Sequence, residues 1–212
     1  FYFNQLSPGG PFFSPKGTTI YNELQTYIRE KYFEYDYQEV ITPQIYDVDL
    51  YHKSGHYDNY KENMYFSKID DRDFSVKPMN CPGHCVLYQA EKKSYRDLPW
   101  RVSDFGRLHR HERSGVMHGL TRVRSFAQDD AHIFCTQDQI KGEFTDVIDF
   151  VIYVFQKLGF DDYTAQISLR DPNNKDKYIG SDENWAKAES AIIEATAERD
   201  LDTVIEYGEA AF

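Results

Sequence analysis

Residues 100–136 constrain the fold most strongly, because they alternate like two β-strands on either side of a polar loop. The predicted loop, residues 113–121, contains serine and glycine. Side chains alternate between the two faces of a strand, so one face of the second strand collects every other residue from Arg122 onward. That face would carry two cations, an aromatic ring, an amide, a carboxylate and an imidazole: Arg122, Arg124, Phe126, Gln128, Asp130 and His132.

The first strand adds Arg110 and Glu112 to this polar set. A solvated outer face of an antiparallel sheet is one explanation. Two observations favour a ligand-binding face instead. Phenylalanine, glutamine and histidine at fixed alternate positions are unusual on a solvated strand, and residues 101–124 contain six arginines and two acids in a chain of net charge −11. Because a local reversal of charge attracts anions, we expect a ligand here, with a phosphate group above all.

The rest of the chain shows a mixed order of helical and strand patterns. Helices are expected over residues 16–33, about 80–92, 137–158 and 182–199. Strands are expected from residue 37 to about Pro43, around 64–66 and 74–77, and over 163–169 and 203–207. Residues 1–16, rich in proline and glycine, predict an irregular lead-in, and residues 170–180 a polar loop. This order favours an α+β fold, an antiparallel sheet backed by helices.

Composition excludes several classes of protein. With 212 residues, 41% of them hydrophobic, the chain can bury a core, and 17 tyrosines and 15 phenylalanines argue against disorder. No apolar run approaches the ~20 residues of a membrane helix, and no secretory signal is visible, so we expect no membrane contact. Three cysteines without framework spacing fit a reducing compartment. We therefore expect a cytoplasmic protein, with an organellar form left open.

Six segments, in order along the whole chain, resemble the catalytic domain of threonyl-tRNA synthetases, a family of class II aminoacyl-tRNA synthetases. They are KPMNCPGH (77–84), YRDLPWR (95–101), FGRLHRHERSG (105–115), HGLTRVRSFAQDDAHIF (118–134), IGSDENW (179–185) and YGEAAF (207–212). The resemblance implies the class II catalytic fold, an antiparallel sheet flanked by helices, over residues 1–212. Residues 17–43 match the family's first motif, which implies a homodimer interface there.

The resemblance also implies roles for single residues. Arg110 matches the arginine that holds the ATP α-phosphate and the amino-acid carboxylate, a contact that stabilises developing charge. Phe126 matches the ring on which adenine stacks, and Glu112 the carboxylate that reads the adenine edge. His56 matches a histidine assigned to proton transfer during transfer to tRNA. The remaining residues expected to bind threonine or ATP are Met79, Arg122, Arg124, Gln128 and Asp130.

Zinc is implied only by the resemblance, since the spacing of Cys81 and His132 is no zinc pattern by itself. The two match a thiolate and an imidazole ligand of the family's zinc ion, and Asp130 matches the carboxylate that receives the threonine ammonium group. The family's third zinc ligand and third class motif would follow Phe212. We therefore expect the chain to be a piece of a synthetase that does not activate threonine alone.

The reaction implied is attack of the threonine carboxylate on the α-phosphorus of Mg-ATP, followed by transfer of the threonyl group to the 3′ end of threonine tRNA. A zinc ion that bonds the hydroxyl of threonine would exclude valine but not serine. Three alternatives stay open at this point: a seryl or prolyl synthetase, a catalytically silent paralogue that acts as a binding or regulatory module, and a purely structural domain.

Overall fold

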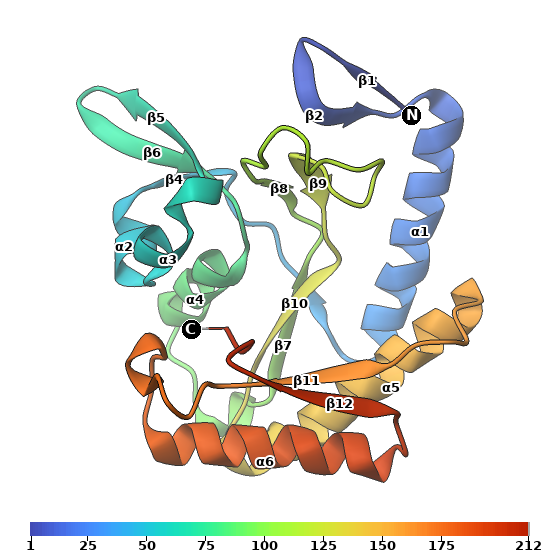
Figure 1. The fold of residues 1–212 in the computed structure, drawn as a ribbon, viewed down its shortest axis with the longest axis vertical. Coiled ribbons are helices and arrows are strands. Elements are labelled where there is room, and N and C mark those ends of the chain that lie inside the picture. Colours follow the sequence, from blue (N-terminus) through green and yellow to red (C-terminus); the bar gives the residue numbers. More distant parts are fainter. Residues whose placement is uncertain (212) are drawn as a thin grey trace. The chain divides into compact units, whose positions relative to one another are not determined.

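The computed structural model describes residues 1–211, which form two compact units, Phe1–Phe134 and a second unit that begins at Cys135 (Figure 1). Phe212, the last residue of the YGEAAF segment, lies outside the described residues. Most paired strands are antiparallel, and helices are interspersed among them. The predicted α+β class is therefore confirmed. Among residues 1–211, no helix combines the length and the hydropathy that crossing a bilayer requires.

The first unit begins with a hairpin, so the predicted irregular lead-in is wrong. Strands β1 (Tyr2–Asn4) and β2 (Ser7–Phe12) pair antiparallel, although β2 contains two prolines. Proline argues against a strand in a sequence because it has no N–H to donate to a neighbouring strand. A long-range contact helps to hold the hairpin in place, since the Arg124 N–H donates to the Gly9 carbonyl oxygen at 2.7 Å.

Helix α1 (Pro15–Glu34) follows, with Pro15 in its first turn as predicted. The strand expected from residue 37 to about Pro43 is the shorter β3 (Gln38–Glu39), and a separate strand, β4 (Ile45–Asp47), begins after Pro43. Strand β3 pairs with β7, and β4 pairs with β6 of another sheet. The chain changes sheets at Thr42, whose buried hydroxyl donates to Asp104 at 2.7 Å, and at Pro43, which cannot donate to a ladder.

A second sheet, in the order β4-β6-β5, contains β5 (Tyr65–Ile69) and β6 (Arg72–Val76), close to the predicted strands. Before it lie two short helices, α2 (Asp49–Lys53) and α3 (His56–Tyr60), and the 3₁₀ helix η1 (Lys61–Asn63). After it comes helix α4 (Cys81–Ala90), in the predicted place, and the 3₁₀ helix η2 (Tyr95–Asp97).

The central pair of strands is present but broken into two sheets. Strands β7 (Trp100–Asp104) and β10 (Asp130–Phe134) pair antiparallel, and β8 (Arg107–His109) and β9 (Ser125–Ala127) form a separate sheet. The first break contains the buried Gly106. A Cβ there would lie 2.7 Å from the Asn80 Oδ1 atom and 2.8 Å from the Lys77 Nζ atom, so this close approach requires glycine. Strand β9 begins only at Ser125, so Arg122 and Arg124 lie before it, outside the regular alternation.

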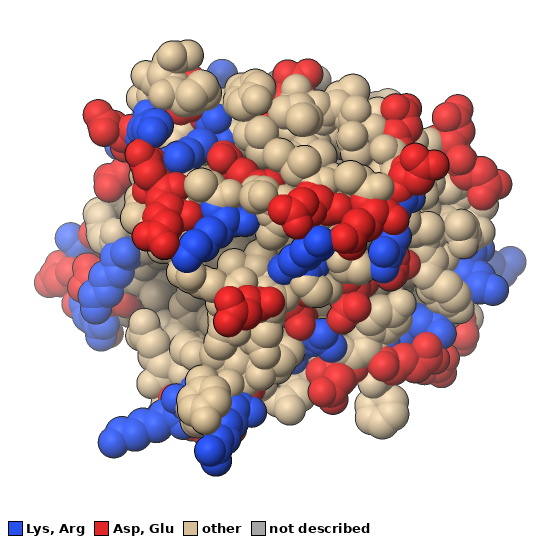
Figure 2. Space-filling model, turned by 90° about the horizontal axis from the view of Figure 1, so that it is seen from below, with Lys and Arg blue, Asp and Glu red and all other residues tan. Residues whose placement is uncertain are grey.

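The second unit contains the 3₁₀ helix η3 (Gln137–Gln139), helix α5 (Ile140–Leu158), strand β11 (Ala165–Leu169), the 3₁₀ helix η4 (Lys175–Lys177), helix α6 (Asp182–Glu198) and strand β12 (Thr203–Tyr207). These match the predicted elements closely. Strands β11 and β12 are parallel. Arg199, just after α6, forms a two-pronged ion pair with Asp149 of α5 at 2.6 and 2.7 Å. Figure 2 shows both acidic and basic side chains on the surface that it views.

Candidate functional site

A cavity of about 600 Å³ lies beside the β8–β9 sheet in the first unit. Its lining combines cations, a carboxylate, amides and aromatic rings from three parts of the chain. The lining residues are Tyr60, Asn63, Arg110, Glu112, Leu120, Thr121, Arg122, Val123, Phe126, Ala127 and Gln128. Five of the predicted site residues, Arg110, Glu112, Arg122, Phe126 and Gln128, are thus brought together. Val123 and Ala127 line the same cavity, so the strict separation of two strand faces is wrong here.

Arg110 is fixed on three sides. Its Nε atom donates to the Pro78 carbonyl oxygen at 3.0 Å, and its backbone N–H donates to the Arg124 carbonyl oxygen at 3.0 Å. Its guanidinium carbon lies 5.2 Å from the centre of the Phe126 ring and 5.8 Å from that of Tyr60. Cation–π contacts of this length orient a guanidinium without using all of its N–H donors. Donors therefore remain for an anionic ligand beside an aromatic surface.

Glu112 and Arg122 form an ion pair on the wall of the cavity. The Arg122 Nε atom donates to the Glu112 Oε2 atom at 3.0 Å; Glu112 is buried and Arg122 is exposed. Arg124 has a different place. Its guanidinium donates to the Glu112 backbone oxygen at 2.9 and 2.6 Å and borders another cavity of about 540 Å³. The structure therefore does not bring Arg124 into the predicted set.

His56 begins helix α3, and Tyr60 ends it. Residues four apart share one face of a helix, so His56 lies on the same side of α3 as the tyrosine that lines the cavity. The His56 Nδ1 atom is 2.8 Å from the Ser54 hydroxyl oxygen, and burial lowers the pKa of this imidazole below its ordinary value. The segment after α3 is held to the site because the His111 N–H donates to the Asn63 carbonyl oxygen at 2.8 Å.

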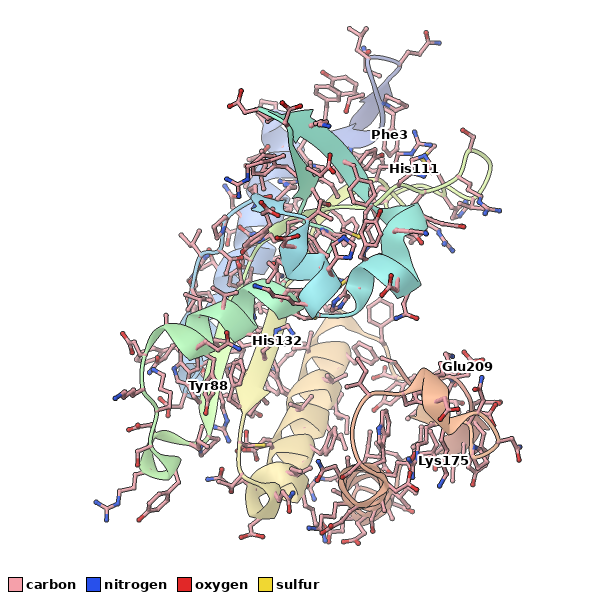
Figure 3. The ribbon with its side chains drawn as sticks, turned by 90° about the vertical axis from the view of Figure 1, so that its left-hand side faces the viewer. Phe3, Tyr88, His111, His132, Lys175 and Glu209 are labelled. Carbon is pink, nitrogen blue, oxygen red and sulfur yellow. The ribbon has the colours of Figure 1, made fainter. Side chains whose placement is uncertain are left out.

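Two side-chain contacts join the start of helix α4 to strand β10. The Asn80 Nδ2 atom donates to the Asp130 Oδ2 atom at 2.9 Å, and the Nδ1 atoms of His84 and His132 are 2.7 Å apart. Figure 3 shows His132 on β10 beside α4. Cys81 lies between these two contacts along the chain, and the negative charge of Asp130 acts on its thiol. Met79 is half-buried just before the helix.

The donor types at this place fit zinc, but the number of ligands does not complete a site. Thiolate and imidazole are common zinc ligands, and zinc sites normally use at least three protein ligands. Within residues 1–211, no group of three or more His, Cys, Asp and Glu side chains is arranged to hold a metal ion. Burial, and then the charge of Asp130, raises the pKa of the Cys81 thiol, and a bound cation would reverse that direction. Burial also lowers the pKa of His132, which keeps the imidazole neutral and able to bind a metal.

A buried polar network lies beneath the junction of α4, β7 and β8. Lys77 and Asp104 form an ion pair at 3.5 Å, with both side chains almost completely buried. The Lys77 Nζ atom donates to the Thr42 hydroxyl oxygen at 2.8 Å, and that hydroxyl donates to Asp104. Burial raises the pKa of Asp104, but contacts with His84 and Thr42 and the charge of Lys77 outweigh it, so the net pKa lies below its ordinary value.

Sequence reasoning missed several of these residues. Tyr60 and Asn63 line the cavity, although their segment shows no pattern that points to β8–β9, which is remote in sequence. Lys77, Asn80 and His84 lie within the quoted KPMNCPGH segment, yet no role was predicted for them. A lysine buried beside an aspartate 27 positions away leaves no local signal.

Comparisons with known proteins bear on the family of the chain. The family model described as "tRNA synthetase class II core domain (G, H, P, S and T)" matches residues 64–208. The curated protein "Threonine--tRNA ligase" of Bdellovibrio bacteriovorus is 58% identical over 212 residues, which are 100% of this chain and 32% of that protein. The chain thus spans about a third of the length of the curated relatives it matches.

Two solved synthetase structures are similar to this chain in fold. The structure titled as the RNA binding domain of threonyl-tRNA synthetase from Cryptosporidium parvum Iowa II has a TM-score of 0.91 and 42% identity, and the match covers 100% of this chain and 52% of that one. Giardia lamblia prolyl-tRNA synthetase, with a TM-score of 0.65 and 18% identity over 71% of this chain and 32% of that one, shows a likeness of fold alone. On the match over residues 64–208, the chain belongs to the class II tRNA synthetase core domain family.

Proposed function

We propose that this chain carries the amino-acid activation site of a threonine–tRNA ligase, which forms threonyl-adenylate from threonine and Mg-ATP and passes the threonyl group to tRNA. One observation carries the proposal. Arg110 lies against Phe126 in a cavity that also presents Glu112 and Gln128, so an anion-binding fork and a flat aromatic surface face one space. Nucleotide triphosphates need this combination of a guanidinium and a ring on which a base can stack. The identity of 58% to a threonine–tRNA ligase supports threonine as the amino acid.

In this proposal the ATP α-phosphate and the threonine carboxylate both lie at Arg110. Attack of the carboxylate on the phosphorus builds negative charge on the phosphoryl oxygens, and pyrophosphate leaves. The guanidinium is already held by the Pro78 carbonyl and two rings, so it can stabilise that charge without rearranging. Phe126 would stack on adenine, and Glu112 would accept from its amino group. Arg122, paired with Glu112, would hold that carboxylate in place, and Mg²⁺ would accompany ATP.

The threonine pocket would lie where α4 meets β10. Asp130 would receive the ammonium group of threonine, with Gln128 and Met79 beside it. Cys81 and His132 would hold zinc together with a ligand from outside the described residues. Bound zinc would supply a Lewis acid for the amino and hydroxyl groups of threonine. Two contacts support this arrangement. Asn80, just before Cys81 in the chain, bonds to Asp130, and His84, just after it, bonds to His132, so the chain around Cys81 is held against β10.

The proposal extends to tRNA transfer, dimerisation and location. His56, half-buried and on the Tyr60 face of α3, would move a proton as the ribose hydroxyl attacks the threonyl-adenylate.

Exposed apolar side chains in residues 17–43 support a homodimer; they include Ile20, Leu24, Phe33 and Ile41, which is 88% exposed. Analytical ultracentrifugation of the full-length protein tests the dimer. Three free thiols support the cytoplasm as the location.

The experiment is threonine-dependent ATP–pyrophosphate exchange by the full-length protein with Arg110→Ala. Loss of a preorganised contact to developing charge costs about 10²–10³ in rate, so exchange should fall by that factor. Arg113→Ala is the matched control, because the Arg113 side chain is exposed and bonds only to the exposed Glu62 side chain among the contacts described. Exchange by the Arg110→Ala protein within tenfold of the control would refute this role of Arg110, whereas no threonine-dependent exchange by the unmutated full-length protein would favour a binding module without adenylation activity.

A further inference from the structure

His84 lies on α4 and is completely buried. Its hydrogen bond with His132 must have one donor and one acceptor nitrogen. The two Nδ1 atoms are 2.7 Å apart, and the rings meet edge to face at 86°. A hydrogen bond of this length needs one N–H and one lone pair, because two protons or two lone pairs would repel. One imidazole therefore carries its proton on Nδ1, and the other does not.

The other side of His84 determines which imidazole is the donor. Its Nε2 atom is buried, has no hydrogen-bond partner within residues 1–211, and lies 3.7 Å from the Asp104 Oδ2 atom. The Asp104 carboxylate accepts from Thr42 and faces the Lys77 ammonium group, so it is a fixed negative charge. A proton on the His84 Nε2 atom is attracted to that charge, whereas a lone pair there would be repelled. In a neutral His84 imidazole with its proton on Nε2, the Nδ1 atom carries the lone pair and accepts from His132.

We propose that Asp104 and His84 act in series as positioning residues, which fix His132 with its proton on Nδ1 and its lone pair on Nε2. Neutral histidine in water favours the opposite tautomer, so this choice has to be imposed by the fold. Binding of zinc by this Nε2 lone pair rests on the proposed function, which places zinc at Cys81 and His132. A metal-binding histidine usually donates its other N–H to a carboxylate or a carbonyl, and here a second imidazole stands between the ligand and the carboxylate.

Two amide variants of His84 distinguish control of the His132 tautomer from a role in packing alone. In His84→Asn, the side-chain oxygen can take the place of the Nδ1 atom and still accept from His132. In His84→Gln, the amide takes the place of the Nε2 atom, so it can face Asp104 but leaves His132 without an acceptor. Both variants keep a polar side chain in the buried site. A packing role predicts that they behave alike, and the proposed role predicts that they differ.

The test combines nitrogen-15 NMR of histidine side chains in the metal-free full-length protein with zinc affinity measured against a chromophoric chelator. The wild type and His84→Asn should show His132 protonated on Nδ1, and their zinc affinities should agree within about threefold. His84→Gln should shift His132 toward the other tautomer and lose about 10–100-fold in zinc affinity. Asp104→Asn should move the tautomer in the same direction as His84→Gln.

Wild-type His132 with its proton on Nε2 would overturn the inference, and so would equal zinc affinities for His84→Asn and His84→Gln. Failure of the proposed function is a separate result. If the wild type binds no zinc while His132 carries its proton on Nδ1, then the zinc site is refuted and the tautomer control by His84 stands.

Discussion

Removal of the Asp104 carboxylate should destabilise the first unit severely. The side chains of Lys77 and Asp104 are 0% and 4% exposed, and their charged atoms are 3.5 Å apart. Asp104→Ala would leave the Lys77 ammonium group buried with only the Thr42 hydroxyl as its hydrogen-bond partner among those described. Loss of one partner from a buried ion pair costs about 3–5 kcal/mol, because the other charge stays buried without compensation. With a urea m-value of about 2 kcal/mol/M, the unfolding midpoint should fall by about 1.5–2.5 M.

The assay can be restricted to the first unit. Residues 1–212 contain two tryptophans, Trp100 on β7 and Trp185 on α6 of the second unit, so a Trp185→Phe background of this 212-residue chain leaves Trp100 fluorescence as the reporter. Glu62→Ala removes the exposed ion pair with Arg113 and should leave the midpoint unchanged, since exposed pairs contribute little. The double change Lys77→Met with Asp104→Leu should recover most of the loss, because it removes both buried charges. A loss below 1 kcal/mol for Asp104→Ala would refute the reasoning, since it would mean that Lys77 is not held there as a buried cation.

Three further predictions follow from the site and its supports. His56→Ala should leave threonine-dependent exchange within about threefold and slow transfer to tRNA about 10²-fold or more, as loss of a general acid–base group does; equal losses in both steps, in exchange and single-turnover transfer assays, would contradict proton transfer. His109 is held neutral because burial, and then the charge of Arg107, lowers its pKa. Its contribution to stability is present above its unfolded pKa of about 6.5 and is lost as pH falls through the lower folded pKa, so His109→Gln should weaken the acid dependence of urea unfolding between about pH 7 and 5; an unchanged slope would count against it. Gly106→Ala should lower the thermal midpoint and the exchange rate together, because its Cβ would lie within 3 Å of Asn80 and Lys77, and an unchanged thermal midpoint would refute the required close approach.

Elements whose signals are local could be predicted from the sequence. Helix α5 has an apolar stripe and ends at Gly159, which has the left-handed conformation of a helix stop, so periodicity and termination agree. Strand β12 was predicted at its observed bounds, and helix α1 within one residue. In these segments the hydrophobic pattern, the turn residues and the helix caps favour the same secondary structure, so tertiary contacts change its bounds little.

Features that depend on distant contacts could not be predicted. The β1–β2 hairpin contains prolines and is fixed by Arg124, which is more than a hundred positions away. The break at Gly106 depends on the approach of Lys77 and Asn80, which no local pattern indicates. Arg124 precedes β9, and its guanidinium binds the Glu112 backbone oxygen instead of joining the predicted polar face, whereas Arg110 and Phe126 lie together. The structure brings five of the predicted polar residues to one cavity, whereas the buried contacts among His84, Asp104 and Lys77 could be found only in the three-dimensional structure.

The most direct test of the central claim is the amino-acid dependence of ATP–pyrophosphate exchange by the full-length protein. The proposed site contains a ligand set for both the ammonium and the hydroxyl group of the amino acid, and a site that must bond a hydroxyl can reject an analogue without it by about 10⁴–10⁵. We expect exchange with threonine, weaker exchange with serine, and exchange with valine or proline lower than with threonine by at least about 10³. Exchange driven equally well by valine or proline, or no exchange with threonine, would contradict it.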